Sequence, residues 1–414
     1  MTEMNFTEGQ NEAINLDAEK ILAVACAGSG KTSVLVERAR RLLNEGKKLY
    51  IVTFTNKATN ELMERLGNEH GGVARISTIH KLAMDVIKKM QHKTEYKEHR
   101  FINTYEARRV LINLLHKHRL YINYKKLFAM YSGNMDDEEL DITWKDRLHF
   151  EMLMEYFDKY LKENKLFDVN GIMELAVAIL EELEHKIECD AIFVDEFQDV
   201  SPIQYEFIKY FDGDHFFVGD PNQSIYAFRG ADMTIISQLR QSKEYEKVDI
   251  DVNFRCRRNV IKYAYQYIFE PLSVKGVKDG GKVEQKEYEH FDEEVLEQIK
   301  EYAEKGFTIL MRWNRNIREF RNYVGEEKFE EYNVMTIHKA KGLEFPKVCV
   351  VMDKSFIKQD YMEEMRVLHV GATRAEDELV VLVHKGLQKE IETIRKLLKE
   401  KTKGVKVEMY KKAS

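Results

Sequence analysis

Paired cysteines and long apolar runs are both missing from this sequence. No apolar run reaches the roughly 18 to 20 residues of a membrane-spanning helix, and residues 1–10 lack signal-peptide character. We therefore expect a soluble, cytoplasmic protein without a membrane partner. The cysteines lie far apart with no paired spacing, which argues against a disulfide framework or a zinc site: Cys26, Cys189, Cys256 and Cys349.

An excess of positive charge is also missing, since the net charge is −6. This average disfavours nucleic-acid binding only weakly, because the charge is unevenly distributed. Residues 81–126 carry 12 Lys and Arg against 4 Asp and Glu, interleaved with tyrosines, whereas residues 134–163 carry 10 acidic against 4 basic residues. A basic run with aromatic side chains suits a phosphate backbone, although solvated helix faces produce such runs about as often.

Glycines are placed informatively in residues 25–32, which read Ala-Cys-Ala-Gly-Ser-Gly-Lys-Thr between an apolar run and a helical pattern. This is a phosphate-binding P-loop in its strand-loop-helix setting. Gly28 and Gly30 allow the tight turn that aims amide N–H groups and a helix N-terminus at phosphate. Lys31 is predicted to contact the β- and γ-phosphates and Thr32 to reach Mg²⁺. The segment predicts a nucleoside triphosphatase; a plain glycine-rich turn is the alternative.

A second apolar run ends in two carboxylates, Asp195 and Glu196. A P-loop enzyme needs one acid for Mg²⁺ and another to polarise water, so we assign Asp195 to the metal and Glu196 to the general base. Adjacent acids after a strand are common by chance, and the pair gains its weight from the P-loop. A further strand ends at Gly219 and Asp220, and Gln223 after it resembles a γ-phosphate sensor.

The order of predicted elements indicates an α/β protein of 414 residues with two or three domains. Strands are predicted near residues 21–25, 50–54, 191–194 and 215–218, and then at 247–251, 308–312, 333–337, 348–352 and 379–383. The interval 81–188 reads as helical. We expect two α/β domains with parallel sheets, at residues 1–90 with 186–244 and at 245–414, and a helical insertion in the first at 91–185.

Further motifs follow in an order that resembles the UvrD/Rep family of superfamily 1 DNA helicases, across nearly the whole chain. The segment 195–199, Asp-Glu-Phe-Gln-Asp, introduces the resemblance, and residues 6–14 with Gln10 are similar to the adenine-reading Q motif. The remaining matches are Thr-Phe-Thr-Asn-Lys-Ala at 53–58, Ser-Thr-Ile-His at 77–80, Asn-Phe-Arg at 253–255, the arginine-rich 312–318, Thr-Ile-His-Lys-Ala-Lys-Gly-Leu-Glu-Phe at 336–345 and Val-Gly-Ala-Thr-Arg-Ala at 370–375.

The resemblance implies two RecA-like motor domains that bind ATP and Mg²⁺ in the cleft between them. Arg255 and Arg374 come from the second domain and resemble arginine fingers. Phe254 would stack on adenine and Glu344 could bond the ribose. The implied catalytic residues are Lys31, Asp195, Glu196, Gln223, Arg255 and Arg374, and the implied ATP-binding residues are Gln10, Ala27, Gly28, Ser29, Gly30, Lys31, Thr32, Ser33, Arg38, Phe254, Arg255, Glu344 and Arg374.

The resemblance also implies stepwise movement along single-stranded DNA, with 3′-to-5′ travel, and contact with DNA junctions. Phe54 and Phe228 would offer faces on which bases stack, although an aromatic residue beside a strand is usually part of the core. His80, His338 and Asn56 have the polarity for phosphate or sugar contacts but are as often structural. The implied DNA-binding residues are Phe54, Thr55, Asn56, His80, Tyr226, Phe228, Arg229 and His338.

The sequence departs from the family in one large feature, because only residues 319–332 stand where members carry a helical insertion in the second domain. Smaller departures are Cys26 for Gly, Phe254 for Tyr, Phe228 for Trp and His369 for Tyr. Two functions remain open: an autonomous helicase, or a DNA-sensing ATPase subunit that acts with a separate nuclease in a defence or repair system without unwinding DNA on its own. The protein partners to consider are a nuclease or a replication or repair protein. A P-loop kinase or switch without nucleic acid is a third class, disfavoured by the second-domain arginines and the motif around Phe54.

Overall fold

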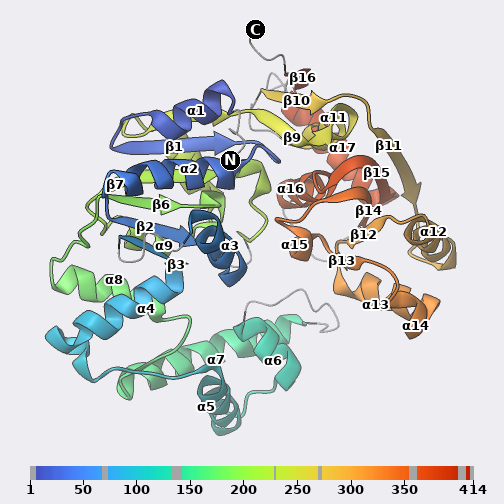
Figure 1. The fold of residues 1–414 in the computed structure, drawn as a ribbon. Coiled ribbons are helices and arrows are strands. Elements are labelled where there is room, and N and C mark those ends of the chain that lie inside the picture. Colours follow the sequence, from blue (N-terminus) through green and yellow to red (C-terminus); the bar gives the residue numbers. More distant parts are fainter. Residues whose placement is uncertain are drawn as a thin grey trace.

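The computed structural model describes residues 6–67, 73–132, 142–227, 230–268, 273–353, 361–399 and 407–410. Two α/β regions stand side by side, and a helical region extends from the first (Figure 1). In this described part of the chain no helix has both the length and the apolar character that crossing a membrane requires.

The first region is built on a six-stranded sheet in the order β3-β2-β6-β7-β1-β8, with every neighbouring pair parallel. Side chains alternate between its faces, so Ile21 and Leu22 of β1 enter different apolar clusters. The strands are β1 (Lys20–Ala25), β2 (Leu49–Thr53), β3 (Ala74–Thr78), β6 (Ala191–Val194), β7 (Asp214–Gly219) and β8 (Glu246–Ile250).

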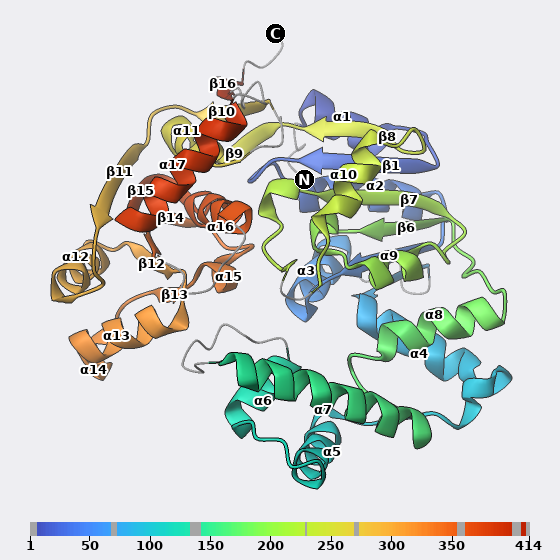
Figure 2. The same cartoon turned by 180° about the vertical axis from the view of Figure 1, so that it is seen from behind.

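Helices cover both faces of this sheet. Parallel strands that are apolar on both sides need such cover on each face. One face packs against α1 (Glu8–Asn15), α2 (Lys31–Asn44) and α3 (Asn56–Leu66). The other face packs against α4 (Ile79–Met90), α8 (Ile172–Glu182), α9 (Pro202–Ile208) and α10 (Met233–Gln241). Figure 2, which views the molecule from behind, shows these helices.

The predicted helical stretch contains a unit with its own apolar core, in which Leu111, Leu127, Leu153 and Phe157 are buried together. One short parallel strand pair interrupts it, which the sequence reading missed. The elements are η2 (Gln91–Lys93), η3 (Glu95–Glu98), β4 (Arg100–Phe101), α5 (Thr104–Lys117), α6 (Tyr124–Tyr131), α7 (Trp144–Glu163) and β5 (Leu166–Phe167).

The second region holds a five-stranded parallel sheet, β11-β15-β14-β12-β13, and a three-stranded sheet, β16-β10-β9. Its strands are β9 (Val252–Arg257), β10 (Val274–Lys278), β11 (Lys282–Tyr288), β12 (Thr308–Met311), β13 (Val334–Thr336), β14 (Phe345–Met352), β15 (Ala375–His384) and β16 (Val407–Met409). Its helices are α11 (Arg258–Tyr265), α12 (Glu293–Glu304), α13 (Asn314–Val324), α14 (Glu326–Phe329), α15 (Ile337–Ala340), α16 (Tyr361–Ala372) and α17 (Lys385–Lys399).

The expected fold class, two RecA-like α/β domains with parallel sheets and a helical insertion in the first, is confirmed. The assignment of residues 247–251 to the second region is wrong, because β8 pairs with β1 through Leu22 and Lys247 and so closes the first sheet. The single residue Asp251 separates β8 from β9. The other domain limits expected from the sequence stay predictions.

Candidate functional site

The phosphate-binding loop lies between β1 and α2, as predicted. Gly28 and Gly30 have φ of 65° and 75°, in the left-handed region that favours glycine. A Cβ on Gly28 would also lie 2.6 Å from Cβ of Arg255, so the second region approaches this backbone closely. No side chain caps the N-terminus of α2, which leaves its first N–H groups available to an anion.

Gln10 holds this loop from the side of α1. Its side-chain oxygen accepts from the Thr7 N–H at 2.8 Å, and its Nε2 donates to the Ser29 carbonyl at 2.9 Å. Arg38, predicted to bind nucleotide, lies outside the residues that line the cleft. Arg38 is buried and donates to the carbonyls of Ala13, Ile14 and Leu16, so it fastens the end of α1 to α2.

The two predicted carboxylates follow β6 and face the loop. Glu196 has a φ of 49°, which is strained for a residue with a side chain. Its Oε2 lies 3.7 Å from the ammonium nitrogen of Lys31 and accepts from Nε2 of Gln198 at 2.5 Å.

Their environments separate the pKa values of the two acids. Burial and then the Glu196 charge raise the pKa of Asp195 to about 7. Burial opposes ionisation of Glu196, but Lys31, Lys341 and the Gln198 hydrogen bond lower its pKa. Glu196 is therefore the ionised acid of the pair, as a general base must be, and Asp195 is the one that a bound cation would ionise.

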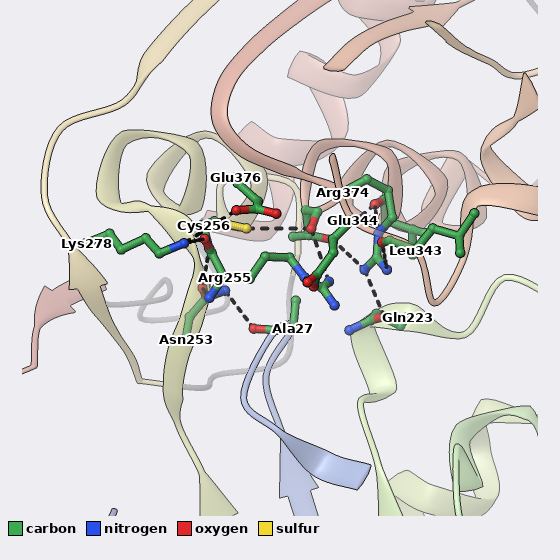
Figure 3. A network of polar contacts seen from close by, with 12 residues as sticks. Ala27, Gln223, Asn253, Arg255, Cys256, Lys278, Leu343, Glu344, Arg374 and Glu376 are labelled. Carbon is green, nitrogen blue, oxygen red and sulfur yellow. Dashed lines mark hydrogen bonds and ion pairs between the residues drawn. The ribbon is translucent and has the colours of Figure 1, made fainter. Parts of the chain in front are cut away.

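The two predicted arginine fingers reach the same cleft from the second region (Figure 3). Arg374 is buried, and its Nη2 donates to Oε1 of Gln223 at 3.4 Å. Arg255 donates from Nε to Oε2 of Glu344 at 2.7 Å. The residue expected to bond the ribose thus pairs with an arginine here.

Contacts across the two regions also hold the phosphate loop, and the sequence reading did not find them. Asn253 is fully buried and donates from Nδ2 to the Ala27 carbonyl at 2.6 Å (Figure 3). The Phe254 N–H donates to the Gly28 carbonyl at 3.0 Å, and the Ala27 N–H donates to the hydroxyl of Tyr265 at 3.1 Å. Asn253 stood inside a recognised motif, which is the signal that could have drawn attention to it.

The cleft between the regions has a volume of about 910 Å³. Ala27 lies beneath the cleft as a buried residue outside its lining. Residues not predicted for the site, among them Glu61, Arg65, Lys278 and Glu376, complete the wall. The predicted residues that line it are Gln10, Gly28, Ser29, Gly30, Lys31, Thr32, Ser33, Asp195, Glu196, Gln223, Phe254, Arg255, Glu344 and Arg374.

The residues present fit a nucleoside triphosphate with Mg²⁺. The buried Ser29 hydroxyl oxygen has no hydrogen-bond partner among the described residues, and Phe254 stands 37% exposed at the cleft. Thr32 and Asp195 supply one hydroxyl and one carboxylate. Mg²⁺ prefers few protein oxygens completed by water and phosphate, which one hydroxyl and one carboxylate can supply.

The predicted DNA-binding residues divide into two groups. Phe54 and Asn56 follow β2, and His80 follows β3. The predicted nucleotide-binding residues follow β6, β7 and β1, so both sets lie at the carboxyl ends of the strands but at different places along the same sheet. Thr55 caps α3 by accepting from the Ala58 N–H at 3.1 Å. Asn56 and His80 are exposed, and Phe54 is half-buried.

His338 and Tyr226 meet at the junction of the two regions. His338 is buried, with Nε2 3.1 Å from the Ile225 carbonyl oxygen, and the Tyr226 hydroxyl donates to the His338 carbonyl at 3.4 Å. The sequence left His338 open between a DNA contact and a structural role; it makes a contact at the junction, and its role in DNA binding stays a prediction. Phe228 and Arg229 lie outside the described residues.

Comparison with known proteins agrees with the geometry. A probable DNA helicase of Mycoplasma pneumoniae is 25% identical over 91% of this chain and 83% of its own length. ATP-dependent DNA helicase PcrA of Staphylococcus epidermidis is 26% identical over 80% of the chain, and ATP-dependent DNA helicase Rep of Escherichia coli is 25% identical over 78%. The chain spans about half the length of the latter two, 50% and 54% respectively.

The family comparison covers more than half of the sequence. Residues 6–244 match the UvrD/REP helicase N-terminal domain, and residues 333–382 match the UvrD-like helicase C-terminal domain. The first match contains the phosphate loop and both carboxylates, and the second contains Glu344 and Arg374. The chain belongs to the UvrD/REP helicase family.

Proposed function

We propose that this protein is an ATP-dependent single-stranded DNA translocase and DNA helicase that moves 3′-to-5′ and acts in the cytoplasm. One observation carries the proposal: Arg374 of the second region contacts Gln223 of the first across the cleft that holds Lys31 and Glu196. Nucleotide chemistry in that cleft is thereby tied to the relative position of the two regions.

Within the cleft each polar group has a distinct task. Lys31 and the N–H groups of the loop would bind the phosphates, Thr32 and Asp195 would hold Mg²⁺, and Glu196 would orient water and take its proton. Mg²⁺ neutralises charge on the phosphates when bound. Arg374 presents a planar fork of N–H donors to charge that develops during transfer.

Closure of the cleft moves the DNA-facing residues. Phe54 belongs to the first region and offers a stacking face, while Tyr226 and His338 lie where the regions meet. Alternating closure and release would shift the strand past these residues. Opening each base pair costs about 1.4 kcal/mol of stacking, so a small step per ATP is sufficient to unwind DNA.

A specific observation favours a second candidate, a DNA-sensing ATPase subunit that works with a separate nuclease in a defence or repair system, without autonomous unwinding. Between β12 and β13 the described chain has only α13 and α14, in agreement with the expectation that this chain lacks the large helical insertion that family members carry there. A smaller DNA-contacting surface suits a subunit that relies on a partner to engage a duplex or junction.

The test measures ATP hydrolysis with and without single-stranded DNA at low salt, because phosphate contacts weaken as ionic strength rises. We expect strong stimulation in the wild type and none in Lys31→Ala or Glu196→Gln. Strand displacement on duplexes with a 3′ or a 5′ tail then reads direction. Stimulated hydrolysis without displacement on either duplex would favour the subunit reading, and hydrolysis indifferent to DNA would reject both.

A further inference from the structure

Gln198 is fully buried and spans the space between two loops of the cleft. Its Nε2 donates to Oε2 of Glu196 at 2.5 Å, and its Oε1 accepts from the Asp220 N–H at 2.9 Å. A carboxylate only accepts and a backbone N–H only donates, so the amide has one orientation that satisfies both neighbours. Neither end of the side chain is free to turn.

The connection continues from Asp220 to the second region. Oδ2 of Asp220 accepts from Nε2 of Gln223 at 2.6 Å, and Oε1 of Gln223 accepts from Nη2 of Arg374 at 3.4 Å. Hydrogen bonds on either side of Asp220, one at its backbone N–H and one at its carboxylate, therefore connect the general base to an arginine of the second region. We call this set of hydrogen bonds the relay; its members are Glu196, Gln198, Asp220, Gln223 and Arg374.

Gln198 is closely packed against Gly219 and Ser224. A Cβ on Gly219 would lie 2.6 Å from the Gln198 Oε1 and 3.1 Å from its backbone nitrogen, so only glycine permits this approach. The hydroxyl of Ser224 donates to the Gln198 carbonyl at 3.1 Å, while the Ser224 carbonyl accepts from Nε of Arg366 at 2.9 Å. The second region thus reaches Gln198 by two routes.

We propose that Gln198 is a positioning residue that ties the orientation of Glu196 to the place of Arg374. Hydrolysis is then fast only when closure of the two regions brings all the hydrogen bonds of the relay into place. The backbone of Glu196 is strained at a φ of 49°, and such strain persists only where the surrounding contacts hold it, as the hydrogen bond from Gln198 does here. The proposal rests on the proposed function because it takes Glu196 as the base.

The first experiment compares Gln198→Met with Gln204→Met. Methionine keeps the length of glutamine and removes both hydrogen bonds. Gln204 is the matched control because its side chain only accepts from the Ser201 N–H at the start of α9. For Gln198→Met we expect DNA-stimulated kcat to fall about 10- to 100-fold, as for a misdirected catalytic group, with KM for ATP unchanged. Gln204→Met should keep the wild-type kcat.

A second variant covers the case in which Gln198→Met does not fold. Gly219→Ala leaves Gln198 in the sequence but places a methyl group against its Oε1. It should lower kcat in the same way without raising KM. A kcat within about twofold of the wild-type value in either folded variant would overturn the proposal. A twofold change in rate corresponds to a change in activation free energy that is too small for a lost positioning contact.

Hydrogen–deuterium exchange of the nucleotide-free protein reads the contact without any activity. The Asp220 N–H should exchange faster in Gln198→Met than in the wild type or in Gln204→Met, because it loses its acceptor. Unchanged exchange there would overturn the relay. Failure of the proposed function shows separately, as wild-type hydrolysis indifferent to DNA, and leaves this exchange measurement intact.

Discussion

The ammonium nitrogen of Lys341 lies 2.5 Å from Oδ2 of Asp199, and both side chains are almost completely buried, with exposed fractions of 8% and 4%. Lys341 follows α15 of the second region, whereas Asp199 follows β6 of the first. The same nitrogen donates to the Gln223 carbonyl at 2.7 Å. A buried charge pair therefore joins the two regions beside the candidate γ-phosphate sensor.

Loss of one partner of this pair should destabilise the protein. In Lys341→Met, Asp199 keeps its burial without its cation, and removing one member of a buried pair costs about 3–5 kcal/mol. Lys339→Met is the control, because Lys339 is exposed on the same segment. Denaturant unfolding of both variants checks this, and equal midpoints would contradict it.

Arg374→Lys should abolish most hydrolysis while ATP still binds. Lysine keeps the charge but lacks the planar fork, and an arginine finger contributes about 10³- to 10⁵-fold to rate. Single-turnover hydrolysis and binding of a fluorescent ATP analogue separate the two effects. Arg395→Lys, in α17 away from the cleft lining, should retain the wild-type rate. Weakened ATP binding with an unaltered single-turnover rate would show that Arg374 acts in binding only.

Substitution of two phenylalanines should separate DNA binding from nucleotide binding. Phe54→Ala removes a stacking face and should weaken single-stranded DNA binding by about 1–3 kcal/mol without changing KM for ATP. Phe254→Ala should raise KM for ATP and leave DNA affinity unchanged, because Phe254 lines the cleft. Fluorescence anisotropy with an oligonucleotide and steady-state kinetics measure both, and each variant serves as the control for the other. Similar effects of the two variants would argue against separate sites.

His215, which lies away from the cleft, should make the stability of the protein depend on pH. Burial, followed by the charge of Lys20, lowers the pKa of His215 to about 4, so protonation favours the unfolded chain. The stabilisation is complete above about pH 6.5 and is lost as pH falls toward 4, at about 1.4 kcal/mol per pH unit. Urea unfolding between pH 7.5 and 5 should show this slope, and it should be smaller in His215→Phe. Identical slopes would assign the dependence to other groups.

The parts of the site that short segments specify could be predicted from the sequence. The turn around Gly28 and Gly30 needs particular residues at fixed spacing. The apolar run of β6 predicts a buried strand that ends just before Asp195. These features depend on local backbone conformation and on the burial of one strand. Their positions in the structure agree with those expected.

Features that depend on how distant segments meet could not be predicted. β8 has the same pattern whichever sheet it joins, and only its pairing with β1 decides. Arg38 stands close to the P-loop in sequence but points toward α1. Asn253 contacts Ala27 and Gln198 contacts Asp220, which are distant in the sequence, and a single sequence gives no measure of such contacts.

The connection through Asp251 sets the kind of motion available to the molecule. With one residue between β8 and β9, and with the Asp251 carbonyl accepting from the Lys275 N–H at 2.8 Å, the backbone at this point cannot lengthen. The two sheets cannot separate at this point, and we expect any change in the width of the cleft to come from backbone rotation beside Asp251. Residues farther from Asp251 would then be displaced more than residues next to it.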